Sequence, residues 1–334
     1  MSKPFIEVKN LRKEFVVEKN IFGKPVKTLK AVDNVSFSIE KNETLGVVGE
    51  SGCGKSTTGR CVLRLIEPSG GEILVDGTDI SQLKEKELLP YRRKLQIIFQ
   101  DPMSSFDPRF TIRRTLLEPM KLHGTVSKGQ YEERARELMD IVGLNSKYID
   151  KYPHEFSGGQ RQRIGIARAL TMNPEFLVCD EPVSALDVSI QSQVLNLFQE
   201  LQEKMGLTYM FISHDLSVVK YISHKVAVMY LGRIVEYAPT EELFAHRLHP
   251  YTQALISAIP ASHPSQKGKR IVLTGDVPSP ITPPSGCHFH LRCPYATEQC
   301  RTVRPDLLEC TPGHFVACHK VNEGVTDKKE DEKV

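Results

Sequence analysis

The sequence has no apolar run long enough to cross a lipid bilayer. Its longest runs, such as VAVMYL at 226–231, are far shorter than the roughly 20 residues that a spanning helix needs. The first residues, MSKPFIEVKN, also lack the apolar core of a secretory signal peptide. We therefore expect the chain to be made and kept in the cytosol. There, its eight cysteines are expected to be buried thiols, metal ligands or redox groups and not a disulfide framework.

The chain also lacks a large excess of charge of either sign. It has 44 Lys and Arg against 41 Asp and Glu, a formal net charge of +3, which is far from the basic excess of a dedicated nucleic-acid binder. We expect no nucleic-acid partner. At 334 residues the chain is long enough for one large domain plus a small one, or for two ordinary domains.

Apolar runs of strand length alternate with amphipathic helical stretches up to about Pro260, which predicts an α/β domain over 1–260 with a mixed or parallel sheet. Three buried strands are expected at TLGVVGE (44–50), FLVCDE (176–181) and YMFISH (209–214), and each ends at polar residues. Ligands of open α/β sheets bind at the carboxyl ends of the strands, so these ends predict a site.

Composition predicts three further segments. ERARELMDIVGL (133–144) looks helical and indicates a helical subdomain at about 106–172. Residues 261–285 are polar and Pro-rich, which is typical of a linker, and we expect a separate cysteine-rich module over 261–320. Residues 321–334 are highly charged and are expected to be a disordered tail.

The stretch GESGCGKS fits the phosphate-loop pattern G-x-x-x-x-G-K-[ST] and lies between a predicted strand and a predicted helix, the context that this pattern requires. In such a loop the backbone N–H groups wrap a phosphate, Lys55 reaches the outer phosphates and Ser56 offers a hydroxyl to Mg²⁺. The predicted nucleotide-binding residues of this loop are Gly49, Glu50, Ser51, Gly52, Cys53, Gly54, Lys55, Ser56 and Thr57.

Polar residues at three other strand ends fit the same chemistry. Asp180 is suited to hold Mg²⁺ through its water shell, and Glu181 is suited to polarise an attacking water. Gln100 and His214 also fall just beyond strands, where they would reach a γ-phosphate or its water. Taken one at a time, such residues are more often ordinary polar loop residues or caps.

The stretch FSGGQRQRIGIARAL adds a second phosphate-binding pattern, because a serine and two glycines open a helix whose first free N–H groups form an anion site. At this point the sequence resembles the ATP-binding-cassette (ABC) family, whose hallmark is an SGGQ signature in addition to the phosphate loop. The resemblance covers about 5–260. It implies a P-loop ATPase fold with a RecA-like core, an antiparallel β subdomain and a helical signature subdomain. The sequence departs from the commonest signature in having Phe156 where Leu is usual.

The resemblance implies roles for individual residues. Phe15 would stack on adenine, with Val16 or Val17 in its place if the register slips. Mg²⁺ would be held by Ser56, Gln100 and Asp180. The catalytic residues would be Glu181 as general base, His214 at the γ-phosphate, Gln100 and Lys55. The residues that close over ATP held by the opposite subunit would be Ser157, Gly158, Gly159 and Gln160.

The resemblance also implies partners. Two cassettes, identical or similar, would sandwich two ATP molecules beneath two integral membrane permease subunits, at the cytoplasmic face of the membrane, and an extracytoplasmic binding protein would deliver the substrate. The C-terminal end points to the dipeptide and oligopeptide importers. The alternatives are an importer ATPase for another small solute (nickel, an opine or an oligosaccharide) and a soluble cassette ATPase acting on nucleic acid or ribosomes.

The C-terminal segment concentrates cysteine. No C-x-x-C pair of the kind that zinc ribbons use is present, and irregular spacing suits an iron–sulfur cluster around which the chain wraps. The segment resembles the C-terminal region of peptide-importer ATPases, in which HPYTQALISAIP precedes a GC…RC…C…H.V.C arrangement that includes Arg292. The resemblance implies a [4Fe-4S] cluster, with Zn²⁺ as the alternative and His288 or His290 as further zinc ligands. The implied cluster ligands are Cys287, Cys293, Cys300 and Cys318, and Cys310 falls outside the arrangement.

Overall fold

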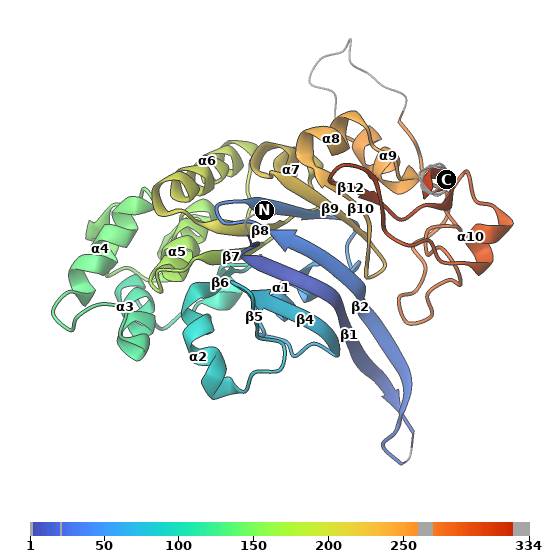
Figure 1. The fold of residues 1–334 in the computed structure, drawn as a ribbon. Coiled ribbons are helices and arrows are strands. Elements are labelled where there is room, and N and C mark those ends of the chain that lie inside the picture. The colour runs from blue at the N-terminus through green and yellow to red at the C-terminus, as the bar shows by residue number, and fades with distance from the viewer. Residues whose placement is uncertain (1–2, 21, 260–269, 323–334) are drawn as a thin grey trace, which may run out of the picture.

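The computed structural model describes residues 3–20, 22–259 and 270–322. These residues form one sheet of eight strands and a second sheet of four, with helices around them (Figure 1). The α/β architecture predicted from the alternating apolar runs is therefore confirmed. Among the described residues, every helix is too short or too polar to cross a bilayer.

The larger sheet has the strand order β11-β12-β10-β9-β3-β8-β7-β6. Five neighbouring strands are parallel, so their carboxyl ends meet at one edge of the sheet. The runs TLGVV, FLVCD and TYMFI are buried along their whole length, as expected for parallel strands covered on both faces. The parallel strands are β9 (Lys225–Tyr230), β3 (Thr44–Val48), β8 (Thr208–Ile212), β7 (Phe176–Asp180) and β6 (Leu95–Ile98).

Helices connect these strands. In chain order they are α1 (Lys55–Val62), α2 (Glu85–Lys94), α3 (Ile112–His123), α4 (Tyr131–Ile141), α5 (Gly158–Leu170), α6 (Val188–Met205) and α7 (Leu216–Ile222). Helices α3 and α4 lie at the end of the molecule away from the C-terminus (Figure 1). One face of each is apolar, and residues such as Leu116 and Leu138 are fully buried in a cluster shared with α5 and α6. These helices lie in the region where the sequence predicts a helical subdomain, and its boundaries remain a prediction.

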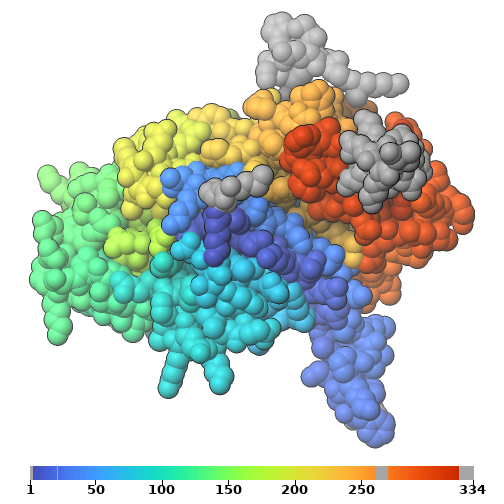
Figure 2. Space-filling model, viewed as in Figure 1, coloured from blue at the N-terminus to red at the C-terminus, as the bar shows by residue number. Residues whose placement is uncertain are grey.

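The smaller sheet is antiparallel and has the order β2-β1-β4-β5. Its strands are β1 (Ile6–Lys19), β2 (Pro25–Ile39), β4 (Gly70–Val75) and β5 (Thr78–Asp79). The far halves of β1 and β2 form a hairpin that projects from the body of the molecule, as the space-filling view shows (Figure 2). Phe22, at the end of this hairpin, is 80% exposed.

The C-terminal part adds α8 (Thr240–Ala245), α9 (Pro250–Ser257), α10 (Glu298–Thr302), β11 (Leu308–Thr311) and β12 (His314–Val316) after β10 (Arg233–Pro239). We expected 261–320 to form a separate module, but β12 pairs with β10 and so continues the larger sheet. Backbone groups of β10 that would otherwise lie at a sheet edge thereby gain partners. Residues 321 and 322 belong to a short turn of helix that begins at 319, and the rest of the predicted tail lies outside the described residues, as does part of the predicted linker.

Candidate nucleotide and cysteine sites

The predicted phosphate loop lies between the carboxyl end of β3 and the first turn of α1. The Lys55 side chain is buried, and its Nζ donates to the carbonyl oxygens of Gly49 at 2.8 Å and Glu50 at 3.0 Å. Glycine is required at position 49, since a Cβ there would meet the backbone carbonyl oxygen of Met229 and, at 2.8 Å, the sulfur of Cys53. The loop is thus folded around its own lysine and backed by β9.

Cys53 lies inside this loop and is buried. Burial raises the pKa of its thiol, although the charge of Lys55 opposes the shift. A raised pKa leaves little thiolate at neutral pH, so these surroundings favour a small packing residue over a reactive cysteine. Burial also raises the pKa of Cys61, to about 11, and that of Cys179.

Ser56 and Asp180, predicted to hold Mg²⁺, come together although they lie 124 residues apart in the chain. The Ser56 hydroxyl donates to Asp180 Oδ1 at 2.6 Å, because α1 begins beside the end of β7. Asp180 is also 3.5 Å from the guanidinium of Arg60, and its side chain is almost fully buried. A hydroxyl and a carboxylate at this separation are oxygen ligands of the kind that Mg²⁺ prefers.

Glu181, Gln100 and His214 converge at the ends of β7, β6 and β8. The Gln100 amide donates to Glu181 Oε2 at 2.9 Å, and Nδ1 of His214 lies 3.3 Å from the same oxygen. The backbone of Glu181 is left-handed, with φ of 48°, a strained conformation for a residue with a side chain. Strained backbone of this kind is concentrated at functional sites, and here the Glu181 carboxylate points toward Gln100 and His214.

The predicted signature forms the start of α5. Ser157 is the N-cap: its hydroxyl accepts from the N–H of Gln160 at 3.3 Å, and the Gln160 side chain accepts from the N–H of Ser157 at 2.9 Å. Gly159 lies against α6, where a Cβ would meet the side chain of Ile190. Ser157, Gly158 and Gln160 are exposed, so this helix start is open to a ligand or a second molecule.

Phe15 lies on β1, opposite Leu29 of β2, and Val16 and Val17 follow it on the same exposed strand. The ammonium of Lys13 lies 5.0 Å from the centre of the Phe15 ring. One face of an exposed aromatic ring is thus near a cation, an arrangement compatible with a second flat group on the ring.

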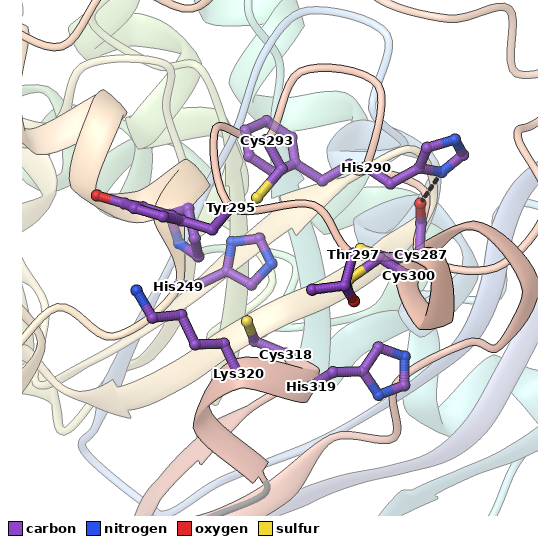
Figure 3. A pocket seen from close by; sticks show the side chains of 12 residues that line it. His249, Cys287, His290, Cys293, Tyr295, Thr297, Cys300, Cys318, His319 and Lys320 are labelled. Atoms are coloured by element: carbon purple, nitrogen blue, oxygen red, sulfur yellow. Dashed lines mark hydrogen bonds between the residues drawn. The ribbon is translucent and has the colours of Figure 1, made fainter.

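The four cysteines implied as cluster ligands line one cavity of about 280 Å³ (Figure 3). Cys287 and Cys293 come from the loop before α10, Cys300 from α10, and Cys318 from the residues after β12. The cavity is also lined by three histidines, His249, His290 and His319. Cys310 lies instead on β11, with its sulfur 3.6 Å from the carbonyl oxygen of Leu308.

All eight cysteines are free thiols, and they include the four around the cavity. Burial and, to a smaller extent, the charges of the other three cavity thiols together raise the pKa of Cys287 to about 11. Within the described ranges, no three His, Cys, Asp or Glu side chains are arranged around one point as ligands of a single ion. The cavity is many times larger than the roughly 10–15 Å³ that one water requires, so its size fits a multi-atom group better than one ion.

Arg292 and Tyr251, to which the sequence patterns gave no role, connect the C-terminal part to the phosphate loop. Arg292, next to Cys293, forms a bidentate ion pair with Glu50. The hydroxyl of Tyr251 accepts from the N–H of Glu50. Arg292 belongs to the RC pair of the cysteine pattern, which was the only signal for it.

Two family models match the chain. The model described as "ABC transporter" matches residues 32–184, and the model described as "Oligopeptide/dipeptide transporter, C-terminal region" matches residues 235–300. The first match includes Glu181 and ends at Ser184. The second begins within β10 and ends at Cys300.

Whole-length relatives are also found. The chain is 53% identical over 317 residues to the oligopeptide transport ATP-binding protein AppF of Bacillus subtilis, covering 94% of this chain and 96% of that protein. It is 50% identical over 333 residues to the putative oligopeptide transport ATP-binding protein YkfD of the same organism, covering 98% of each.

Similar solved structures cover most of the chain. A dimeric ATP-binding cassette, MJ0796, in a post-hydrolysis state with ADP and Pi, has a TM-score of 0.62 and 27% identity, covering 70% of this chain and 98% of that one. The cbiO1 protein of Clostridium perfringens, part of an ABC transporter complex, has a TM-score of 0.63 and 26% identity, covering 74% and 92%.

Proposed function

The chain belongs to the ABC transporter ATPases of the oligopeptide/dipeptide class, and we propose that it is the ATP-hydrolysing subunit of an importer for short peptides. The observation that carries the proposal is the convergence of Glu181, Gln100 and His214 in a chain whose C-terminal part is matched by the peptide-transporter model. Gln100 and His214 meet at Glu181, as ATP hydrolysis requires of a base and the groups that orient it.

In this proposal each strand end contributes one part of the reaction. Lys55 and the loop N–H groups bind the β- and γ-phosphates, and Ser56 and Asp180 hold Mg²⁺, which neutralises phosphate charge when bound. Glu181 accepts a proton from the attacking water. Gln100 and His214 hold that carboxylate in place, and His214 also reaches the γ-phosphate. Phe15 stacks on the adenine ring.

The proposed working unit is a dimer of cassettes. The signature is exposed at the start of α5, where it is free to close over ATP held by the phosphate loop of a second cassette. The MJ0796 cassette is a dimer in its solved structure. Hydrolysis would remove the γ-phosphate contacts that hold the two subunits together, so that opening and closing is the mechanical output.

Glu181→Gln tests the catalytic part. We expect ATP hydrolysis to fall by about 10²–10⁴-fold, the usual effect of losing a general base, with ATP affinity unchanged. Glu175→Gln is the matched control, since this half-exposed acid lies at the opposite end of β7 and pairs with Lys94. Turnover of Glu181→Gln within a few-fold of wild type would remove Glu181 from the role of base.

Ser157→Arg in the Glu181→Gln background tests the sandwich. The parent is expected to form an ATP-dependent dimer, seen as a doubling of mass by light scattering, and the arginine to prevent it by filling the signature. Ser127→Arg, at an exposed position between α3 and α4, is the control that should still dimerise. Dimerisation of Ser157→Arg equal to the parent would contradict the sandwich.

The proposed partners are two permease subunits and, outside the membrane, a peptide-binding protein, which would place the chain at the cytoplasmic face. Import of nickel, an opine or an oligosaccharide is the alternative, because selectivity is set by the other polypeptides. Affinity purification of the chain from its native cells should recover integral membrane proteins and a permease pair. Recovery with ribosomes or RNA in high salt would favour the soluble class instead.

We further propose that Cys287, Cys293, Cys300 and Cys318 hold a [4Fe-4S] cluster. Free thiols around a cavity of about 280 Å³ have the donor type, the number and the space for it. When bound, the cluster would cross-link the loop, α10 and the end of β12 through iron–sulfur bonds. The thiols themselves would lose their protons on binding, because thiolate is the ligating form.

Anaerobic purification followed by iron and acid-labile sulfide assays tests this site. Wild type and Cys310→Ala should carry about four of each per chain, whereas Cys300→Ala should carry far less. Zinc in a ratio of one per chain, with no sulfide, would show the alternative metal and overturn the cluster.

A further inference from the structure

Glu50 has its side chain, its N–H and its carbonyl oxygen engaged at once. Its carboxylate accepts from the two terminal nitrogens of Arg292 at 2.8 and 3.0 Å. Its N–H donates to the hydroxyl of Tyr251 at 2.9 Å, and its carbonyl oxygen accepts from Lys55 Nζ at 3.0 Å. Two of these three contacts come from outside the loop, so the C-terminal part helps to fix the backbone at the start of the phosphate loop.

The Arg292 side of the ion pair is buried, and the Glu50 side is partly buried. The Arg292 side chain is 7% exposed and that of Glu50 28% exposed. A buried charge that loses its partner is costly, and a two-pronged pair fixes orientation as well as distance. The position of Arg292 therefore determines the position of the Glu50 carboxylate.

Arg292 is in turn placed by the loop 287–293, which carries Cys287 and Cys293. Phe289 of this loop packs on Tyr230 of β9 and Tyr251 of α9, with ring centres 5.3 and 5.4 Å apart, and the two tyrosines lie 4.8 Å from each other. The guanidinium of Arg292 lies 6.0 Å from the centre of the Tyr230 ring. Phe289 also lines the cysteine cavity, so one ring cluster borders both the cavity and the support of the phosphate loop.

We propose that Arg292 is a positioning residue for the phosphate loop: it holds Glu50 so that Lys55 is set for the nucleotide phosphates, and it makes ATP affinity depend on the order of the cysteine loop. This inference rests on the proposed function for its ATP site. It gives the cysteine cavity a role in the ATPase cycle beyond stapling the C-terminal part. Since the pair acts on binding geometry and touches no reacting atom, its loss should weaken ATP binding more than it slows the chemical step.

Arg292→Met and Glu50→Gln test the first half by steady-state kinetics. Each should raise KM for ATP by about tenfold or more, the usual value of a hydrogen-bonded charge pair, while kcat at saturating ATP stays within about twofold. Arg292→Lys, which keeps the charge, should recover part of the affinity. The double variant should be no worse than the worse single one, because both remove the same interaction.

Arg247→Met is the matched control. Arg247 is exposed, lies in the same C-terminal part and donates to the carbonyl oxygen of Phe244, so its loss should leave KM unchanged. An unchanged KM in both Arg292→Met and Glu50→Gln, additive single effects, or a fall in kcat with KM unaltered would each overturn the proposal. Should Arg292→Met fail to fold, Arg292→Lys and Glu50→Gln carry the same test.

Hydrogen exchange tests the second half without relying on turnover. In the full-length protein, Cys300→Ala should speed exchange of the amides at 49–54 and weaken binding of a fluorescent ATP analogue, whereas Cys310→Ala should do neither. In the Arg292→Met background, Cys300→Ala should add nothing further. Equal exchange at 49–54 in wild type and Cys300→Ala would overturn the coupling. Absence of ATP hydrolysis in wild type would instead count against the proposed function, since exchange is measured independently.

Discussion

The nucleotide site takes its side chains from the ends of parallel strands that lie side by side in one sheet, whereas the cysteine cavity takes its sulfurs from a loop, a short helix and the end of a hairpin strand. The first is supported by strands that are buried over their whole length. The second borders segments that are mostly half-exposed. One is preorganised by the core, and the other depends on local contacts or on a bound group.

This difference assigns different sensitivities to the two regions. In the nucleotide site, the sheet fixes the backbone positions, and close packing leaves no space for an added methyl group. In the cysteine region the fixed points are few, among them Glu236, the Arg292–Glu50 pair and the Phe289 ring cluster. Substitutions should therefore act mainly on binding in the first region and mainly on local stability in the second, with Arg292 as the proposed link between the two.

The largest effect is expected for Gly49→Ala. The added Cβ would meet the Met229 carbonyl oxygen and the Cys53 sulfur, and both are held by buried structure. The loop would have to move away from β9 and take Lys55 with it. We expect ATP binding to be lost beyond measurement in isothermal titration, while circular dichroism still shows the native helix and strand content.

Gly129→Ala is the control for this change. Position 129 has open space around it, with no atom within 4 Å of where the alanine methyl group would lie, and an ordinary φ. The free energy of unfolding of Gly129→Ala should differ from that of wild type by less than about 1 kcal/mol, and any change should be an increase. ATP binding by Gly49→Ala at wild-type affinity would show that the nucleotide site accommodates an added methyl group. It would then not be the more rigid of the two regions.

The same contrast explains what the sequence allowed us to predict. Glu181 and His214 were predicted because each follows a continuous apolar run, and parallel strands bring such positions together whatever their separation in the chain. Arg292 and Tyr251 were not, because their partner Glu50 is reached through loop geometry that no periodicity encodes. The pairing of β12 with β10 was missed for a related reason: a three-residue strand carries too little pattern to reveal its neighbour.

Glu236→Ala should have the next largest effect, on the stability of the cysteine region. This buried carboxylate accepts from the N–H groups of Leu248 and His249 and lies 2.9 Å from Nε2 of His314 on β12. Its removal would leave buried polar groups without partners, at about 1–3 kcal/mol each. We expect the free energy of unfolding to fall by about 3 kcal/mol, with hydrogen exchange accelerated first in β11, β12 and α9.

Glu309→Gln is the control, in the β11–β12 hairpin that Glu236 contacts, since Glu309 is exposed and its carboxylate accepts from the N–H of Gly313, which a glutamine oxygen can replace. It should change stability by less than about 0.5 kcal/mol. Uniform acceleration across β3, β7 and β8 in Glu236→Ala would show that the two regions unfold as one, which would break the comparison.

The smallest effect is a pH dependence from His249. Burial lowers its pKa from 6.5 to about 4, with the carboxylate of Glu236 opposing the shift. The unfolded chain therefore binds this proton near pH 6.5 and the folded chain only near pH 4, so acid favours unfolding between these values. The stabilising contribution is fully present above about pH 6.5 and declines below it by at most about 1.4 kcal/mol per pH unit.

His249→Asn, which keeps an acceptor at the start of α9, should flatten this part of the profile in denaturant titrations at pH 7, 5.5 and 4.5, roughly the span that the two pKa values define. Parallel profiles for wild type and His249→Asn would place the acid sensitivity elsewhere in the chain.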